Sequence, residues 1–156
     1  MKQAPTLKFA SDSTSADFLA SRVIEAYQNL NPTKLDEVAT LYTSDVFFED
    51  PTYGVQGKTA VLAHFSNTFK KLQGCSFTFH RTVSDGADIF LAWTMTAKHP
   101  KVLKGKVVRV EGASYLKTRN GKIYYHRDYF DMGSLLYEHL PLIGKVIQKI
   151  KQRVAR

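Results

Sequence analysis

Residues 76–86 alternate between apolar and polar side chains and then reach an Asp-Gly pair: Ser76-Phe77-Thr78-Phe79-His80-Arg81-Thr82-Val83-Ser84-Asp85-Gly86. A period of two predicts a half-buried strand, and Asp-Gly is a strong signal for a hairpin turn. The returning strand is expected over residues 89–97, and a second hairpin at Asn120-Gly121 joins expected strands 106–118 and 123–131. Because hairpins join antiparallel neighbours, this half of the chain predicts a mostly antiparallel sheet.

Working outward, the first half of the chain has helical periods. A capping box at Thr14–Asp17 predicts the start of a first helix, and Asn31-Pro32 predicts its end. A short second helix precedes a strand-like run at residues 46–50, and a third helix ends at Gly74. We therefore expect an α+β fold, in which a curved, mostly antiparallel sheet wraps around helices as a cystatin-like cone with an apolar pocket at its open end.

The domain organisation follows from length and charge. The chain has 156 residues, which fits one domain. We expect a flexible arm over residues 1–13, the cone over residues 14–132 and a basic amphipathic C-terminal helix over residues 133–156. The formal net charge is +8, and residues 140–156 hold five basic residues and no acidic one. Much of the excess positive charge therefore lies in this last segment.

Several functional classes lack their signatures. No helix-turn-helix, zinc-finger or RNA-recognition motif accompanies the basic residues, so we expect no nucleic-acid partner. The apolar runs are too short to span a bilayer, the first residues lack the apolar stretch of a secretory signal, and Cys75 stands alone, so we expect a cytoplasmic protein. Without metal-ligand spacing or a phosphate-binding glycine motif, neither a metal nor a cofactor is expected.

The C-terminal segment allows two interpretations. Basic residues cover much of the surface around an apolar face made of Leu142, Ile143, Val146, Ile147, Ile150 and Val154. We favour a helix that packs this face on the sheet or across the pocket mouth, with solvated lysines outside. The alternative is an interfacial helix over residues 142–156 that is attracted to anionic lipid or to a partner protein.

Two segments carry candidate catalytic groups. One is Phe48-Glu49-Asp50-Pro51-Thr52-Tyr53, which places acids beside aromatic residues. In the other, the alternation of a strand puts four side chains on one face: Tyr124, His126, Asp128 and Phe130. A carboxylate among aromatic walls loses hydration, which raises its pKa, and two inward-pointing carboxylates would raise one pKa further. Such a group is suited to act as a general base near neutral pH.

These segments resemble a known family. Phe48-Glu49-Asp50-Pro51 after two helices, and Gly121-Lys122-Ile123 leading into Arg127-Asp128-Tyr129-Phe130-Asp131, are similar to the SnoaL-like branch of the nuclear-transport-factor-2-like superfamily, over residues 15–135. In the limonene-1,2-epoxide hydrolases of this superfamily, the aspartate matching Asp128 helps to activate the attacking water. In its ketosteroid isomerases, the aspartate matching Asp50 moves a proton between carbon atoms.

The remaining catalytic groups of both enzymes are missing. The arginine and second aspartate of the epoxide hydrolases fall on Ala92 and Thr94, and the enolate-stabilising tyrosine and aspartate of the isomerases fall near Ala26 and Ala113. Two functions therefore stay open. One is an enzyme of isomerase, cyclase or hydrolase type that uses aspartate chemistry on a small hydrophobic molecule. The other is a non-catalytic module that binds a ligand or a partner protein, with association at a membrane surface as a further option.

For the enzyme, we assign Asp128 as the first base and Asp50 as a second base or as the group that orients water. The orienting donors would be Tyr53, Tyr124 and His126, and the pocket would be lined by Phe48, Phe130, Ala92 and Thr94. Simpler roles stay open for three of these residues: a structural ion pair or a solvent-facing strand position for Asp128, a hydrogen-bonded core histidine for His126 and a turn cap for Asp50.

Histidines 64 and 80 are expected to be structural. The resemblance also implies a homodimer through the outer face of the sheet, with Trp93, Tyr125 and Tyr129 as contacts.

Overall fold

The computed structural model describes residues 13–31, 33–98, 100, 105–140 and 142–154. The elements in chain order are α1 (Ser13–Gln28), α2 (Leu35–Leu41), β1 (Tyr42–Glu49), β2 (Gly54–Gln56), α3 (Lys58–Phe69), β3 (Cys75–Asp85), β4 (Asp88–Lys98), β5 (Val107–Arg119), β6 (Lys122–Phe130), α4 (Met132–Leu135), the 3-10 helix η1 (Tyr137–His139) and α5 (Ile143–Val154). Residues 1–12 of the arm that was expected over residues 1–13 lie outside the described residues, and Ser13 begins α1. Pro32 of the helix end expected at Asn31-Pro32 also lies outside them, and α1 ends at Gln28.

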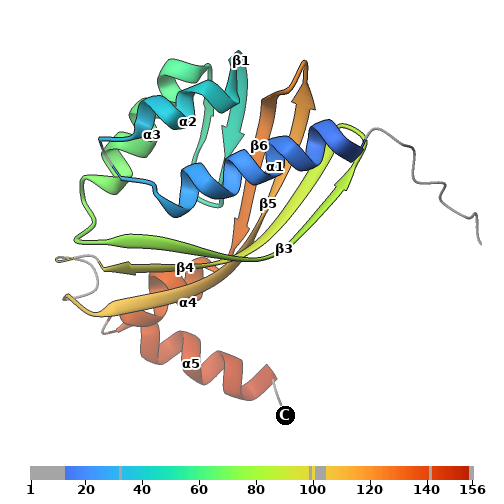
Figure 1. Cartoon of the computed structure of the whole chain (residues 1–156). Coiled ribbons are helices and arrows are strands. Elements are labelled where there is room, and N and C mark those ends of the chain that lie inside the picture. Colours follow the sequence, from blue (N-terminus) through green and yellow to red (C-terminus); the bar gives the residue numbers. More distant parts are fainter. Residues whose placement is uncertain (1–12, 32, 99, 101–104, 141, 155–156) are drawn as a thin grey trace, which may run out of the picture.

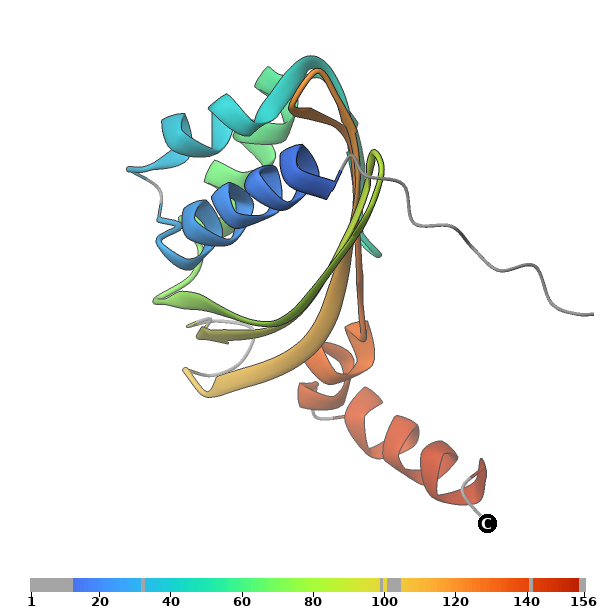
Figure 2. The ribbon, with the colours of Figure 1, turned by 45° about the vertical axis from the view of Figure 1, so that its right-hand side comes forward.

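The strands form one curved sheet in the order β2-β1-β6-β5-β4-β3, and α1, α2 and α3 cover its concave face (Figures 1 and 2). Only β1 and β6 pair in parallel among the described strands, which confirms the expected mostly antiparallel α+β fold. Both expected hairpins form, and the turn residues Asn120 and Gly121 have φ of 52° and 68°, as a tight primed turn requires. Strand β2 was not expected.

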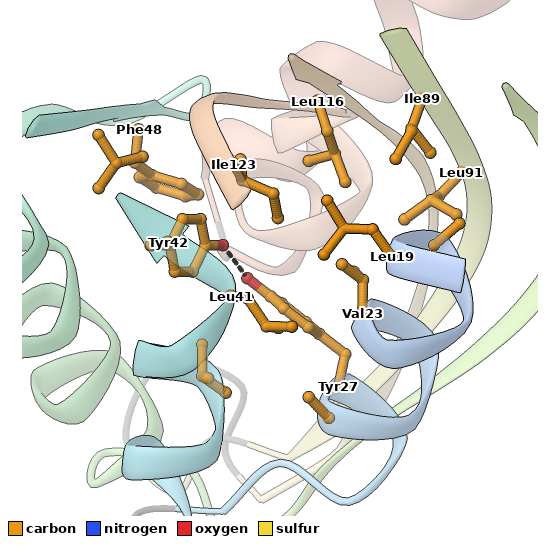
Figure 3. Close-up of a cluster of buried hydrophobic side chains, with 14 of the residues drawn as sticks. Leu19, Val23, Tyr27, Leu41, Tyr42, Phe48, Ile89, Leu91, Leu116 and Ile123 are labelled. Carbon is orange, nitrogen blue, oxygen red and sulfur yellow. Dashed lines mark hydrogen bonds between the residues drawn. The ribbon is translucent and has the colours of Figure 1, made fainter. Parts of the chain in front are cut away.

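The core lies between α1 and the sheet (Figure 3). Leu19 and Val23 of α1 meet Leu91, Leu116 and Ile123 of three strands, and each of these side chains is buried. Removing such a side chain from water contributes about 1.5–3 kcal/mol, so this contact holds the long helix inside the curve of the sheet.

One core residue corrects the expected dimer contacts. Trp93 is buried on the concave side, because odd-numbered residues of β4 such as Ile89 and Leu91 face the helices. Its predicted place on the outer sheet face was wrong. Tyr129 is 47% exposed and Tyr125 is half-buried. The homodimer itself stays a prediction.

A β-bulge corrects a second expectation. Lys117 pairs with Tyr125, but Thr118 pairs with Ile123, which leaves Tyr124 as an extra residue in β6. Ile123 and His126 are therefore both buried although they are three positions apart. The ring of Tyr124 lies instead under the guanidinium of Arg119, 5.2 Å from it. The prediction that Tyr124 shares a face with His126 was wrong, because a period of two fails across a bulge.

The position of the C-terminal segment corrects a third expectation. Helix α5 runs away from the sheet (Figure 2) and touches the body of the protein through η1. Most of its apolar face is exposed, at Ile143 50%, Val146 59%, Ile150 55% and Val154 81%, and Ile147 is half-buried. The expectation that this face packs on the sheet or over the pocket mouth was therefore wrong. No helix in the described ranges is long and apolar enough to cross a membrane.

Candidate functional site

A cavity of about 300 Å³ opens between the helices and the concave face of the sheet. Its walls are mainly apolar and include six aromatic side chains in addition to Tyr27: Phe48, Phe65, Phe69, Phe77, Trp93 and Phe130. The side chains of Asp50 and Asp128 both line this cavity, although they lie 78 positions apart in the sequence. The structure thus brings together two acids from different strand ends in apolar surroundings.

Asp128 is held by one of its two carboxylate oxygens. Its Oδ1 accepts hydrogen bonds from Ser114 Oγ at 2.6 Å and from His126 Nε2 at 2.8 Å. Within the described residues, no donor reaches Oδ2. The side chain is 19% exposed and lines the cavity. The Oδ1 bonds therefore fix the orientation of the carboxylate and leave the other oxygen available to a ligand.

A buried hydrogen-bond chain extends from His126. The Tyr42 hydroxyl lies 2.6 Å from His126 Nδ1, and the Tyr27 hydroxyl lies 2.7 Å from that of Tyr42 (Figure 3). In the neutral tautomer of His126 whose Nε2 donates to Asp128, Nδ1 accepts from the Tyr42 hydroxyl, and Tyr42 then accepts from Tyr27. In this tautomer the chain of donors runs from Tyr27 to Asp128.

Both tyrosines of this chain keep their protons. Burial raises the pKa of the Tyr42 hydroxyl well above its ordinary value of 10. Burial is also the largest cause that raises the pKa of Tyr27. The nearby Tyr42 and the charge of Asp128 raise it further. Neither phenol can supply a base near neutral pH. They serve as donors that hold His126, and through it Asp128.

A second chain reaches Asp128 from the other side. Trp93 Nε1 donates to Ser114 Oγ at 2.8 Å, and Ser114 donates to Asp128 Oδ1. The indole ring lies against Gly112, where an added Cβ would stand only 2.3–2.6 Å from three ring carbons. Glycine is therefore required at position 112 for the indole to keep this place and this bond.

Asp50 is held in a different way. Its Oδ1 accepts from the backbone N–H groups of Thr52 at 2.6 Å and Tyr53 at 3.0 Å, and from the Thr52 hydroxyl at 2.5 Å. This pattern is a turn cap between β1 and β2, which was the simpler of the two roles considered for this residue. Oδ2 lies 3.6 Å from His64 Nε2.

These contacts decide the protonation of Asp50. Burial alone would raise its pKa, but the interaction with His64 and the hydrogen bonds from Thr52 and Tyr53 stabilise the charged form and outweigh burial. The pKa of Asp50 therefore lies below its ordinary value. The expectation that the aromatic pocket raises the pKa was wrong for this carboxylate, because the loop supplies donors that sequence patterns do not show.

His64 is the functional candidate that sequence reasoning missed. It lines the cavity from α3, and its ring lies 5.5 Å from those of both Phe48 and Tyr53. The only available signal was helical spacing, since His64 precedes buried Phe65 and follows buried Val61 by one turn. That spacing places it toward the sheet but does not reveal Asp50 as its neighbour.

The remaining expected site residues lie in three places: in the cavity wall, at the cavity rim and on parts of the sheet that do not face the cavity. Phe48 and Phe130 line the cavity, whereas Tyr53 is 57% exposed and stacks on His64. Ala92 is exposed on the convex side, and Thr94 is buried but bonded to His80 Nε2 at 2.7 Å. The prediction that Ala92 and Thr94 line the pocket was wrong, because even-numbered residues of β4 face away from the cavity.

The described residues bring together no group of three or more His, Cys, Asp and Glu side chains that could hold a metal ion. The candidate chemistry of the cavity thus rests on carboxylate and imidazole groups.

A cone of this kind, with a cavity between a curved sheet and its N-terminal helices, defines the nuclear-transport-factor-2-like class of folds. A family model described as a SnoaL-like domain matches residues 23–126, and the chain belongs to this family. No curated protein matches the chain in sequence.

Solved structures share the fold at low sequence identity. An LEH-like epoxide hydrolase from M. tuberculosis is 21% identical, with a TM-score of 0.65 over 86% of this chain and 97% of that one. A protein from Jannaschia sp. CCS1, described as a SnoaL-like polyketide cyclase, is 12% identical, with a TM-score of 0.70 over 78% and 89%. AclR from Streptomyces galilaeus, described as a hydroxylase, is 18% identical, with a TM-score of 0.69 over 93% and 94%. These likenesses establish the fold alone.

Proposed function

We propose that this protein is an enzyme that acts on a small hydrophobic molecule by general-base chemistry, with Asp128 as the base. The observation that carries the proposal is the asymmetry of this carboxylate. Oδ1 is fixed by Ser114 and His126, while no donor from the described residues occupies Oδ2, on a side chain that lines an aromatic cavity. A positioned base of this kind contributes roughly a hundred- to ten-thousand-fold to a rate.

The cavity defines the class of ligand. Its volume is at the lower end of the range for small-molecule sites, about 300 Å³, and its walls are largely apolar. Such walls favour a compact, apolar molecule. A carbonyl compound with an acidic C–H, or an epoxide or lactone attacked by an activated water, would present a proton to Oδ2 of Asp128. Both reactions are compatible with the same base.

The pair formed by His64 and Asp50 would act on a second group of the ligand. His64 can hold or donate a proton at an oxygen atom, and the Asp50 carboxylate orients its ring. This pair supplies polar groups to the cavity wall, whereas Ala92 and Thr94 do not line the cavity. Tyr53, stacked on His64 at the rim, would help to hold the ring in place.

A ligand carrier is the second candidate function. The side chains that line the cavity include no Arg or Lys, so that a cation for stabilising an oxyanion is absent from the described wall. A carrier needs only the apolar walls. It would bind the same ligands without turnover.

One experiment separates these functions. Trp93 is the single tryptophan and lies in the cavity wall, so its fluorescence reports ligand binding. Wild type, Asp128→Asn and Asp50→Asn would be tested with apolar ketones, epoxides and lactones for fluorescence change and for turnover. An enzyme retains binding in Asp128→Asn but loses turnover. Binding without turnover in the wild type supports the carrier, and no binding at all would refute both functions.

A further inference from the structure

Helix α5 presents an apolar face that the rest of the protein does not cover. Ile143, Val146, Ile150 and Val154 recur every three or four residues, and each is at least half exposed. At about 100° per residue, these four side chains fall within an arc of about 80°. Leu142, just before the helix, extends the same surface and is 82% exposed. A contiguous apolar face of this kind indicates an interaction surface.

Basic residues border this face on both sides. Lys145, Lys149 and Arg153 follow one another at intervals of four residues along one border, and Lys151 lies on the other. Residues 140–156 contain no acid, and Lys151 alone of these four pairs with described acids elsewhere, Glu138 and Asp131. The positive charge that can meet a partner is therefore that of Lys145, Lys149 and Arg153. The surface thus combines exposed apolar side chains with a positive rim.

The helix is fixed to the body of the protein by its third side. Gly144 lies so close to Glu138 that an added Cβ would stand 2.2 Å from the Glu138 carbonyl oxygen. The Gly144 N–H donates to the Leu140 carbonyl at 2.8 Å, and Lys151 donates to the Glu138 carboxylate. Lys151 also lies 3.8 Å from Asp131. These contacts hold α5 beside η1 and leave its apolar face turned to solvent.

We propose that α5 is an interfacial helix that binds the surface of an anionic lipid membrane through this face. The apolar side chains would enter the boundary between headgroups and acyl chains, and the basic rim would meet the anionic headgroups. The charge argues against pairing with a second copy of α5, since that would bring two positive rims together. At about 1.5 Å per residue, twelve residues are about 18 Å long, which suits a helix lying in the interface rather than crossing it.

The position of α5 also bears on the substrate, and this step rests on the proposed function. The short helix α4 lies between the cavity and η1, and it supplies Met132 and Leu135 to the cavity wall. A membrane bound by α5 would therefore lie near this wall. The substrate class that fits this placement is a lipophilic molecule that partitions into membranes.

The test is co-sedimentation of the full chain with vesicles. Vesicles that contain phosphatidylglycerol in phosphatidylcholine are expected to bind the protein at low salt, and phosphatidylcholine vesicles to bind it weakly. High salt should reduce binding to the anionic vesicles, because it screens exposed charges. Absence of co-sedimentation with anionic vesicles at low salt would overturn the proposal.

Three variants test the two parts of the surface. Val146→Gln with Ile150→Gln removes apolar area without a change of charge, and should weaken binding at least about tenfold. Lys145→Gln, Lys149→Gln and Arg153→Gln together should weaken it roughly a hundredfold at low salt. The matched control removes three positive charges from exposed positions elsewhere and should bind as the wild type does: Lys70→Gln, Lys71→Gln and Lys122→Gln.

Two further outcomes contradict the inference. Equal loss of binding in the charge control would show that net charge, and not α5, drives the association. A change of oligomeric mass in the Val146→Gln, Ile150→Gln variant, without vesicle binding by the wild type, would assign the face to a second copy. Turnover by cavity variants is measured separately. Failure of the proposed function therefore leaves the vesicle result intact, and the reverse also holds.

Discussion

The two aspartates of the cavity have the same side chain but different surroundings. Asp128 is held by Ser114 of the neighbouring strand β5 and by the buried His126 of its own strand, and among the described residues these donors engage Oδ1 alone. Asp50 is held by its own loop, which supplies three hydrogen bonds to one oxygen, while His64 of α3 lies beside the other oxygen. The difference shows that lining a cavity does not make a carboxylate a base. The number of oxygens left without a donor matters as much.

The largest expected effect comes from Asp128→Asn. The amide oxygen can still accept from Ser114 and His126, so the fold should remain, but the base is lost. Turnover should fall about a hundred- to ten-thousand-fold while ligand quenching of Trp93 fluorescence persists. Asp50→Asn, measured under the same conditions, should lose less turnover than Asp128→Asn. A greater loss in Asp50→Asn would reverse the roles assigned to the two carboxylates.

Gly112→Ala tests the hydrogen-bond chain in which Trp93 holds Ser114 and Ser114 holds Asp128. The new methyl group would displace the buried indole, at an expected cost of about 1–3 kcal/mol in the free energy of unfolding. It should also break the bond from Trp93 to Ser114. Chemical denaturation gives the first effect, and the emission wavelength of the single tryptophan gives the second. If Gly112→Ala has the same stability and the same emission wavelength as the wild type, the indole has room to move and the prediction is wrong.

Two matched variants, Tyr42→Phe and Tyr27→Phe, test the hydrogen-bond chain that leads from the tyrosines to Asp128. Tyr42→Phe leaves both His126 Nδ1 and the Tyr27 hydroxyl without a partner in a buried site, and should destabilise the fold by about 1–3 kcal/mol. Tyr27→Phe removes only the end of the chain and should cost about 0.5–1.5 kcal/mol. Urea denaturation of both variants measures the difference. Equal costs would contradict the direction deduced for the chain.

The smallest expected effect is a pH dependence at Asp50. Because its pKa is lower in the folded state than the ordinary 3.8, its contribution to stability is complete above that pH and is lost as pH falls through the folded pKa. Asp50→Asn should therefore lose less stability than the wild type on acidification below about pH 4. Other carboxylates with lowered pKa, such as Asp45 and Asp131, are common to both proteins. Parallel thermal unfolding curves at each pH would contradict the expectation.

Sequence patterns predicted the fold from local signals. The hairpin at Asn120-Gly121 and the alternation after Ser76 depend on neighbours in the chain, and the structure contains both hairpins. The faces of the strands were predicted less well. A bulge displaced Tyr124, and the inward face of β4 was assigned to Ala92 and Thr94 when Trp93 occupies it.

The site was only partly predictable because its contacts are not local. Asp50 and Asp128 were named from their surroundings and a family resemblance, but Tyr42, Ser114 and His64 come from three separate elements. Their proximity depends on the register of β5 with β6 and on how α3 packs, which no periodicity encodes. The exposed face of α5 was equally hidden, since an amphipathic pattern does not state what covers it.

The difference between the two oxygens of Asp128 predicts what happens to a hydrogen isotope that is carried by the ligand. Under the proposed function, a hydrogen taken from a ligand would arrive at Oδ2, which accepts no hydrogen bond from the described residues. Both chains behind Oδ1 run inward from donors, Tyr27 and Trp93, and offer no route for that hydrogen to leave. A deuterium atom on the ligand should then be returned to the product in preference to exchange with bulk water.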